Sequence, residues 1–395
     1  MSEWNLKTLG SMCVKIGSGA TPTGGQESYI DEGISLIRSQ NVDDHQFLYD
    51  GLAHINDDQA NKLNNVTVEA NDTLINITGD SVARVCSVPI NILPARVNQH
   101  VAIIRTDGKQ LDNCFIKYSL LSMKEHLLSI SEIGATRRAL TKSMLDNLEI
   151  LTPNIKEQKA IASVLSSLDD KINLLHQQNK TLEAMAETLF RQWFVEEVGD
   201  DWEEGDISYY ASHLKTSIQP QNNPQIEYFH YSIPSFDKKK QPVKESGSEI
   251  QSNKYCLEKN CILFSKLNPH KEKRIWLLQK EVEENSICST EFQVIKPYNI
   301  KYLYYLYGLL SYKQNYLEIA SSVGGTSGIH QRIDPATIFS YICPIVPLKI
   351  IENYNEHIIP LFKKIYINQA QIQTLEIFRD TLLPKLMSGE VRVEI

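Results

Sequence analysis

The side chains best suited to binding in this sequence are hydrogen-bonding residues in short polar runs, several of which contain glycine. In the first half these runs supply Ser18, Thr21, Arg38, Gln40, Asn41, Thr136, Arg137 and Arg138. In the second half they supply Lys215, Lys266, Lys271, Lys273, Arg274, Thr326, Ser327, His330 and Arg332. Residues of these types hydrogen-bond the edges of nucleic-acid bases and contact phosphates. The alternative for each is a solvated surface residue without a role.

Sequence signatures of catalysis are absent. The sequence has neither a Gly-x-x-x-x-Gly-Lys-Ser/Thr phosphate loop nor a Gly-x-Gly-x-x-Gly fingerprint. The Asn-Pro-Pro-aromatic signature of amino-methylating enzymes that flip a base is missing too, and the nearest string is Asn268-Pro269-His270. Seven cysteines are scattered singly, and Cys256 and Cys261 have no second pair at zinc-site spacing. We therefore expect no metal site and a reducing, cytoplasmic environment.

Two long helices are expected to position the polar runs. Asn154 and Glu157 form a capping-box pattern at the start of the first helix. An apolar seam follows in alternating steps of four and three residues, the period of a coiled coil: Ile161, Leu165, Leu168, Ile172, Leu175, Asn179, Leu182, Ala186, Leu189 and Trp193. The same phase recurs 193 positions later, with two polar breaks: Tyr354, Ile358, Leu361, Ile365, Asn368, Ile372, Leu375, Arg379, Leu382 and Leu386.

This recurrence predicts a tandem repeat and an α+β fold. Two globular α/β domains, residues 1–152 and a second domain that follows a hinge within 199–347, are expected to be separated by two long helices at 153–198 and 348–395. We expect the helices to pair as an antiparallel coiled coil with pseudo-two-fold symmetry, although each seam could also belong to an ordinary amphipathic core helix. Expected strands are 33–38, 73–77, 100–104, 261–264 and 292–295, and expected shorter helices are 112–130 and 299–320.

The charge distribution bounds the kind of nucleic-acid binding that is possible. The net charge of −8 divides into −5 over residues 1–152, −6 over 153–205, +3 over 206–347 and zero over 348–395. A non-specific nucleic-acid binder is normally basic overall. Either the positive surface is local, or a partner supplies much of the phosphate contact. No apolar run reaches the ~18 residues that a membrane span needs, and the N-terminus lacks the layout of a signal peptide.

The chain resembles the specificity subunits of type I restriction-modification systems over nearly its whole length. In the first half the resemblance rests on the order of short matching runs at residues 4–10, 17–22, 37–42, 72–79, 98–105 and 134–140, which lead into Pro153 and the first long helix. In the second half it rests on 261–269 and 287–294, which resemble another branch of the family. Residues 206–250 match poorly.

The resemblance implies a non-catalytic subunit that recognises DNA. Each globular domain would be a target-recognition domain that reads one half of a bipartite double-stranded target, while the paired helices set the spacer and dock methyltransferase (modification) subunits, two of them in this family. Restriction/translocase subunits would complete the complex. The methyl donor, ATP and magnesium would be bound by partner subunits, with no cofactor in this chain.

Two functions from other classes remain as alternatives. One is a stand-alone nuclease or methyltransferase with an unrecognised site, which incubation of the purified chain with DNA, magnesium and methyl donor would reveal. The other is a coiled-coil scaffold that binds only protein, which salt-dependent DNA binding in the presence of partners would exclude. Within the family, a silent copy that does not assemble is a further possibility.

Overall fold

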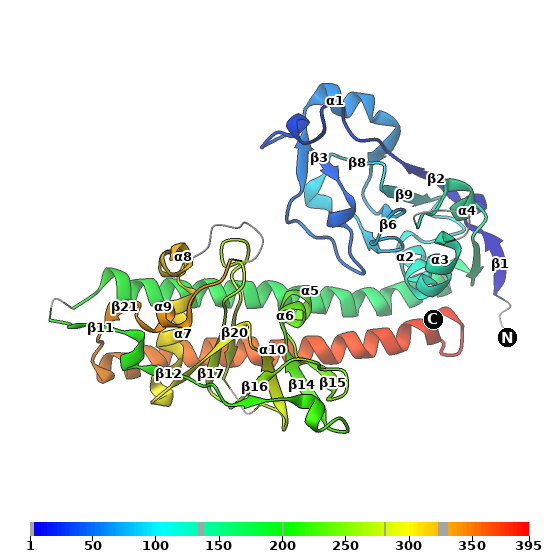
Figure 1. Ribbon diagram of the computed structural model, residues 1–395. Coiled ribbons are helices and arrows are strands. Elements are labelled where there is room, and N and C mark those ends of the chain that lie inside the picture. The colour runs from blue at the N-terminus through cyan, green and yellow to red at the C-terminus, as the bar shows by residue number, and fades with distance from the viewer. Residues whose placement is uncertain (1–3, 133–137, 200, 280–281, 323–330, 395) are drawn as a thin grey trace. The chain divides into compact units, whose positions relative to one another are not determined.

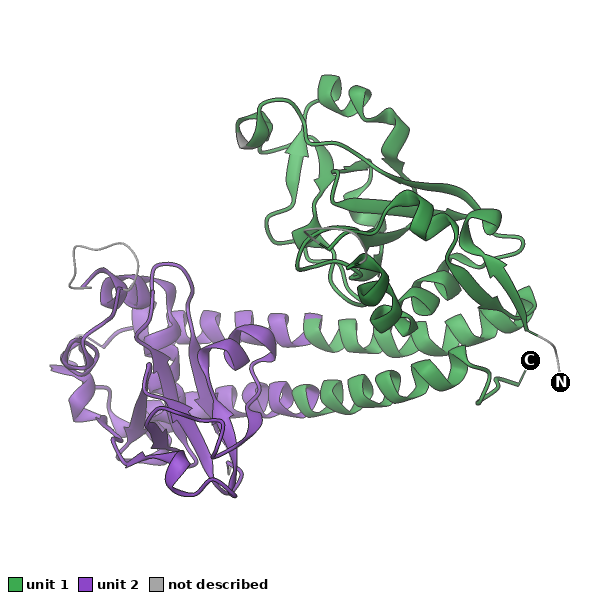
Figure 2. Ribbon diagram, turned by 45° about the vertical axis from the view of Figure 1, so that its right-hand side comes forward, with its two compact units in different colours: residues 1–176, 369–395 green, residues 177–368 purple. Residues whose placement is uncertain are grey.

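The computed structural model describes residues 4–132, 138–199, 201–279, 282–322 and 331–394 of the chain. The chain forms two compact units (Figure 2): unit 1 contains residues 1–176 and 369–395, and unit 2 contains residues 177–368. Each unit includes one globular part with sheets and a stretch of both long helices (Figure 1). The expected α+β class is confirmed. No described helix is both long enough and apolar enough to cross a membrane.

Unit 1 contains two four-stranded sheets and a two-stranded ribbon. The first sheet is antiparallel and has the order β2 (Cys13–Ser18), β9 (Val101–Thr106), β6 (Thr73–Asn76) and β7 (Val85–Ser87). The second has the order β4 (Ala53–Ile55), β3 (Ile34–Ile37), β8 (Ala95–Val97) and β5 (Thr67–Val68), and its β3–β8 pair is parallel. The ribbon pairs β1 (Asn5–Thr8) with β10 (Glu149–Thr152).

Unit 2 repeats this topology. Its antiparallel sheet has the order β12 (Ala211–His213), β20 (Phe292–Pro297), β17 (Cys261–Ser265) and β18 (Ile275–Leu278). Its second sheet has the order β13 (Ser217–Ile218), β16 (Lys254–Cys256), β19 (Ser286–Ser289), β14 (Glu227–Tyr231) and β15 (Val243–Ser246). The ribbon pairs β11 (Glu204–Asp206) with β21 (Ile342–Pro344).

The parallel pair β14–β19 takes the place of β3–β8, and β13 is an addition at the sheet edge. Strands β12 to β15 come from the region 206–250, where the sequence gives no clear alignment with the first half. The repeat there is preserved in backbone pairing rather than in side chains.

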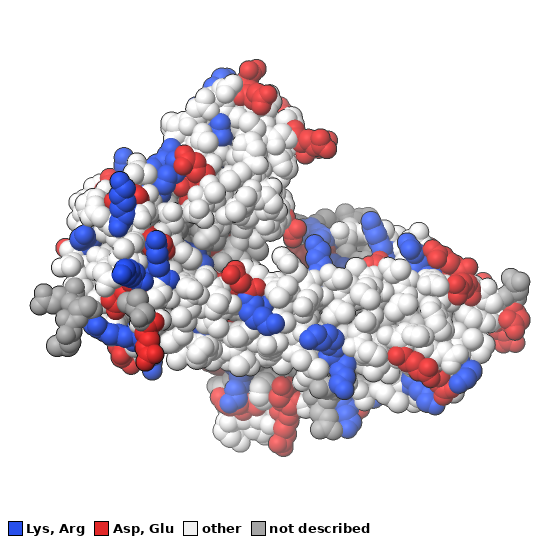
Figure 3. Space-filling view, turned by 180° about the vertical axis from the view of Figure 1, so that it is seen from behind, with Lys and Arg blue, Asp and Glu red and all other residues white. Residues whose placement is uncertain are grey.

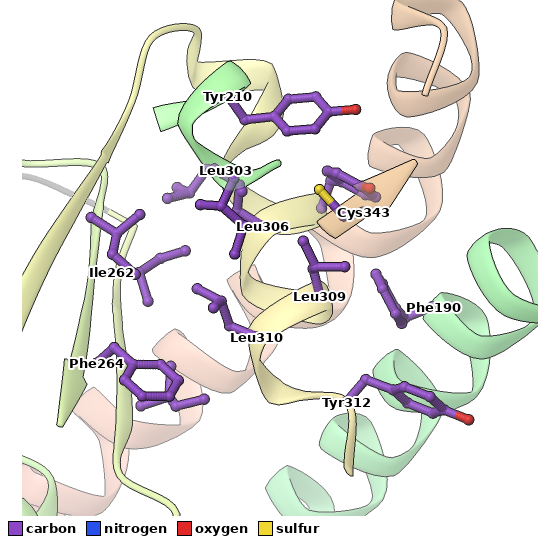
Figure 4. Close-up of a cluster of buried hydrophobic side chains, with 14 of the residues drawn as sticks. Phe190, Tyr210, Ile262, Phe264, Leu303, Leu306, Leu309, Leu310, Tyr312 and Cys343 are labelled. Carbon is purple, nitrogen blue, oxygen red and sulfur yellow. The ribbon is translucent and has the colours of Figure 1, made fainter. Parts of the chain in front are cut away.

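The shorter helices cover the sheets of their own unit. In unit 1 they are α1 (Asp57–Lys62), α2 (Asn113–Ser122), α3 (Lys124–Ser131) and α4 (Lys142–Asp146). In unit 2 they are α6 (Ile233–Lys239), α7 (Leu303–Ser311), α8 (Lys313–Ser321) and α9 (Pro335–Phe339). The two single helices expected at 112–130 and 299–320 are each broken in two, at Met123 and at Tyr312. Figure 4 shows the core of unit 2, where Leu306 and Leu310 of α7 face Ile262 and Phe264 of β17.

Two long helices run through the structure, α5 (Ile155–Arg191) and α10 (Leu348–Met387), with a π-helical turn at Gln192–Glu196 after α5. Asn154 caps α5 as expected, because its Oδ1 accepts hydrogen bonds from the amides of Lys156 and Glu157 over 3.1 and 3.0 Å. The compact units divide both helices, between residues 176 and 177 and between 368 and 369. Each globular part therefore shares its core with pieces of both helices.

The two helices pair antiparallel within each unit. In unit 1, Leu165 shares a cluster with Leu383 and Leu386, whereas Ile172 packs with Ile372. In unit 2, Asn179 bonds Asn368, and the rings of Phe194 and Tyr354 lie 4.8 Å apart. Every member of the expected seam is buried or half-buried. The neighbours Asp169, Phe190 and Phe194 are also buried, since a real helix drifts from a strict 3.5-residue period.

A buried ionic cluster joins the globular part of unit 1 to the helices. Asp169 of α5 accepts hydrogen bonds from Nζ of Lys117 at 2.9 Å, from the hydroxyl of Tyr118 at 2.7 Å and from Nη1 of Arg379 at 3.0 Å. Nδ1 of His45 lies 3.5 Å from the same carboxylate. Burial alone would raise the pKa of Asp169, but the contact with His45 and the charge of Lys117 hold it well below its usual range.

Unit 2 has aromatic packing at the corresponding place. The position 193 residues after Asp169 is Phe362, and Ala186 stands 193 residues before Arg379. The ring of Phe362 lies 5.2 Å from that of Tyr307 of α7, edge to face. A cavity of about 300 Å³ is lined by Ala186, Tyr307 and Phe362 among others. At this place, therefore, one repeat contacts the helices through charged groups and the other through aromatic rings.

Candidate nucleic-acid interface

Three polar segments that are separate in sequence meet at one edge of unit 1. The amide of Gly19 donates to the carbonyl of Asn98 over 3.0 Å, and the amide of Asn98 donates to the carbonyl of Ile37 over 3.0 Å. A Cβ on Gly19 would lie 1.9 Å from the carbonyl oxygen of Val97, so this approach requires glycine. The loop that carries Ser18 and Thr21 therefore lies next to the turn that begins at Arg38.

A chain of polar side chains runs along this edge. The Thr21 hydroxyl bonds Oε1 of Gln99, and Nε2 of Gln99 lies 2.9 Å from Nε2 of His100. Nδ1 of His100 lies 2.6 Å from the hydroxyl of Thr78. Gln99, His100 and Thr78 were not among the predicted site residues. Thr78 directly follows the expected strand 73–77, Gln99 directly precedes the expected strand 100–104, and His100 is the first residue of that strand.

Arg138 joins the same edge through the backbone. The amide of Gly79 donates to the carbonyl of Arg138 over 3.1 Å, and the amide of Leu140 donates to the carbonyl of Ile77 over 2.8 Å. Nη2 of Arg138 lies 2.6 Å from Oε1 of Glu132, and both side chains are about half exposed. Such surface pairs are weak, so Glu132 does not prevent Arg138 from contacting a phosphate. The predicted residues Thr136 and Arg137 lie outside the described residues.

The turn after β3 presents Arg38 and Gln40 and buries Asn41. The Asn41 side chain is 0% exposed. Its Nδ2 donates to the carbonyl of Leu48 over 2.9 Å, and its Oδ1 accepts from the amide of Arg38 over 3.0 Å. The prediction that Asn41 contacts DNA is therefore corrected: its amide holds the turn. Asn76 has a similar role, because its buried Nδ2 donates to the carbonyl of Ser39 over 2.9 Å.

Unit 2 builds the corresponding edge from the same backbone contacts. The amide of Lys266 donates to the carbonyl of Glu291 over 2.9 Å, and the amide of Ile333 donates to the carbonyl of Lys266 over 3.1 Å. A bridge between Leu267 and Arg332 takes the place of the bridge between Thr78 and Ala139 in unit 1. Arg332 forms a two-pronged ion pair with Glu291, at 3.0 and 2.7 Å, which neutralises much of its charge.

A neutral histidine lies between the positive side chains of this edge. Burial, together with the charges of Lys215 and Lys266, lowers the pKa of His213 to about 4. The His213 ring stacks on Phe339, with centroids 5.9 Å apart. Lys215 is exposed and Lys266 is half-buried, so the edge carries net positive charge that anions can approach.

The predicted basic run 266–274 does not form one cluster. Arg274 is only 9% exposed and is held by Asp237 at 2.6 Å and by Glu272, so the prediction that it contacts DNA is corrected. Nζ of Lys273 donates to the carbonyl of Ser311 over 2.8 Å, whereas Lys271 is exposed. Thr326, Ser327 and His330 lie outside the described residues.

The charged surface is mixed. Figure 3 shows lysine and arginine interspersed with aspartate and glutamate on the face in view, without one continuous basic stripe. Within the described ranges, no group of three or more His, Cys, Asp and Glu side chains is placed to hold a metal ion. The two edges are therefore local polar surfaces, made of hydroxyl, amide, imidazole and a few cationic groups.

Comparison with known proteins finds similarity to one group of proteins. The family profile described as "Type I restriction modification DNA specificity domain" matches residues 1–184. The chain is 29% identical to the type I restriction enzyme MjaIX specificity subunit of Methanocaldococcus jannaschii, over 99% of this chain and 94% of that protein. It is 26% identical to the MjaVIII specificity subunit of the same organism, over 47% of this chain and 43% of that protein.

The fold agrees with this similarity. The crystal structure of the type I restriction-modification S subunit from M. genitalium matches with a TM-score of 0.60 at 16% identity, covering 99% of this chain and 96% of that chain. The relative at full length and the shared fold extend the match beyond the first half of the chain. Residues 1–184 therefore match the DNA specificity domain of type I restriction-modification systems, and the chain is similar over nearly its whole length to a specificity subunit of such a system.

Proposed function

We propose that each globular part reads one half of a bipartite double-stranded DNA target through its polar edge. The observation that carries this proposal is the same backbone framework with different side chains in the two units. The polar edge of unit 1 carries Thr78, Gln99 and His100, whereas that of unit 2 carries Lys215, Lys266 and the Arg332–Glu291 pair. A shared framework with different polar groups can place two readers in the same way on different bases.

The long helices then set the spacer and dock the other subunits. Large apolar side chains remain exposed on the helices within each unit, among them Leu174 and Phe378 in unit 1 and Ile359 and Ile367 in unit 2. Exposed apolar side chains of this kind are suited to a protein partner. We assign this surface to methyltransferase subunits, two for each chain. Restriction/translocase subunits complete the complex. The methyl donor, ATP and magnesium belong to these partners, and the complex acts in the cytoplasm.

Domain exchange tests the two-reader proposal. Residues 206–347 are replaced by the corresponding domain of another specificity subunit, and the modified motif is determined by modification-sensitive long-read sequencing of cells that contain the whole system. We expect one half of the motif to change and the other half to stay. A change in both halves would contradict independent readers, and the absence of any motif that depends on the chain would contradict the DNA-recognition role.

Helix insertion tests the spacer. One heptad is inserted into α5 and one into α10, which preserves the phase of the apolar seam. We expect both half-sequences to stay the same and the gap between them to lengthen. An unchanged gap would contradict the role of the helices as the ruler.

A further inference from the structure

Two polar side chains in unit 1 share one hydrogen-bond acceptor. Nη2 of Arg38 and Nε2 of Gln40 both donate to the carbonyl oxygen of Gly51, the latter over 3.1 Å. Gly51 has a φ of +66°, a backbone conformation that favours glycine. The common acceptor holds the ends of both side chains close together.

The Arg38 guanidinium presents one edge outward. Its Cζ lies 5.1 Å from the centre of the Tyr29 ring, which therefore covers one face of the guanidinium. Its Nε is buried and has no hydrogen-bond partner in the described part of the chain. The edge left for a ligand is the one formed by Nη1 and Nη2. Gln40 is exposed and keeps its Oε1 and one amide hydrogen for a ligand.

We propose that Arg38 reads a guanine and Gln40 reads an adenine in neighbouring base pairs of the half-target of unit 1. This inference rests on the proposed function. In the major groove, paired arginine N–H groups match O6 and N7 of guanine, and a glutamine carboxamide matches N6 and N7 of adenine.

The spacing follows from the shared acceptor. Two donors on one oxygen lie within roughly 6 Å of each other, since each hydrogen bond is about 3 Å long. Neighbouring base pairs are separated by about 3.4 Å along the DNA axis. The two side chains therefore reach adjacent base pairs and are too close together to read bases several pairs apart.

Buried amides make this reader rigid. Asn41 bonds the amide of Arg38 and the carbonyl of Leu48, and Asn76 bonds the carbonyl of Ser39. All of these bonds fix the backbone that carries Arg38 and Gln40. A reader that is held in place before binding discriminates bases more sharply than a flexible one.

Sequencing of variants in the complete system tests the assignment, once exchange of residues 1–152 has identified their half of the motif. The incoming domain is chosen to carry a cation at the place of Lys117, so that the ion pair with Asp169 is kept. We expect that half to contain a guanine next to an adenine on one strand. Arg38→Lys keeps the charge but loses the fork, so the guanine position alone should become degenerate. Gln40→Glu should relax the adenine position toward a cytosine contact. Arg84→Lys and Gln177→Glu make the same chemical changes elsewhere and should leave the motif unchanged.

A base analogue tests the contact with the wild-type complex and so does not depend on the folding of a variant. The predicted guanine is replaced by 7-deazaguanine, which lacks the N7 acceptor. We expect wild-type affinity to fall roughly tenfold, with no such fall for Arg38→Lys. An identified half without a guanine–adenine step, or an equal loss for both proteins, would overturn the assignment and leave the proposed function standing. If exchange of residues 1–152 changes neither half, the proposed function itself fails.

Discussion

Nδ2 of Asn368 donates a hydrogen bond to Oδ1 of Asn179 over 2.9 Å inside the apolar seam of α5 and α10. Both side chains are buried, with 0% and 8% exposure. The residue 193 positions after Asn179 is Ile372, and the residue 193 positions before Asn368 is Leu175. These two apolar residues pack together in unit 1. A single polar pair among apolar layers fixes the register of a coiled coil, because any shift buries each amide without a partner.

Removal of one member of this pair should destabilise the protein. Asn368→Leu leaves the Asn179 amide buried and unpaired, at a cost of about 1–3 kcal/mol. The double variant Asn179→Leu, Asn368→Leu should regain that stability, because both polar groups are gone. Urea unfolding followed by circular dichroism measures both effects. Gln177→Leu, at an exposed position of α5, is the control and should change little. Equal losses in the single and double variants would contradict the pairing.

The Asp169 cluster should contribute far more stability than an exposed ion pair. Asp169→Asn leaves Lys117 buried without a countercharge and leaves Arg379 with Asp380 as its acidic partner. Loss of one partner of a buried ion pair typically costs about 3–5 kcal/mol. Glu196→Gln removes a pair with Arg191 in which both side chains are about half exposed, and it should cost at most about 1 kcal/mol. Thermal unfolding at pH 7 compares them, and similar small shifts in both variants would contradict the role of the cluster.

The Asp169 contribution should also depend on acidity. Since the pKa of the folded state lies below the unfolded value of 3.8, the stabilisation is complete above that pH. It is lost as the pH falls further, toward the pKa of the folded state. The difference in stability between wild type and Asp169→Asn should therefore narrow below pH 3.8. A difference that narrows already between pH 7 and 5 would contradict this assignment.

His213 should make unit 2 sensitive to a milder acid range. Its pKa of about 4 lies below the ordinary 6.5, so protons bind the unfolded state more readily. Stability is therefore complete above pH 6.5 and declines as the pH falls toward 4. Between pH 7.5 and 5, the Tm of His213→Gln should fall by about 2–4 °C less than the Tm of the wild type. His126→Gln, at an exposed position of α3, should keep the wild-type drop. Equal drops in all three proteins would contradict the prediction.

Phosphate contacts should appear in the salt dependence of DNA binding by the assembled complex. Lys215→Ala and Lys266→Ala should each reduce the slope of log affinity against log salt by about 1. Arg332→Ala should have a smaller effect, because Glu291 already pairs with the guanidinium. Lys244→Ala, whose ammonium group pairs with Glu227, serves as the control. Fluorescence anisotropy over a salt series gives the slopes, and unchanged slopes for both lysines would place the DNA elsewhere.

The sequence predicted the secondary structure correctly where regularly spaced residues determine it. The seam of α5 and α10, the cap at Asn154 and the main strands follow from period and residue type alone. It was less informative where a contact depends on sheet register. Thr21, Gln99 and Thr78 meet only because β2, β9 and β6 pair as they do, and no local pattern encodes that pairing.

Buried polar side chains were the other source of error. Asn41 and Arg274 have the residue types of a DNA-binding surface, yet each is buried and forms hydrogen bonds within the fold. Their partners, the carbonyl of Leu48 and the carboxylate of Asp237, come close only in the folded chain. Residue type cannot separate a side chain that reads DNA from one that holds the reader.

The difference between the Asp169 cluster and the Tyr307–Phe362 packing limits how genes for such chains can recombine. Lys117 belongs to the globular part of unit 1, and its countercharge belongs to α5. A crossover in the gene between codons 117 and 169 separates the two charges. If the incoming sequence comes from the other repeat, an aromatic residue equivalent to Phe362 replaces Asp169 and faces the buried lysine. Viable hybrids should therefore inherit a recognition domain together with the helix segment on which it rests, or carry a cation at the same place.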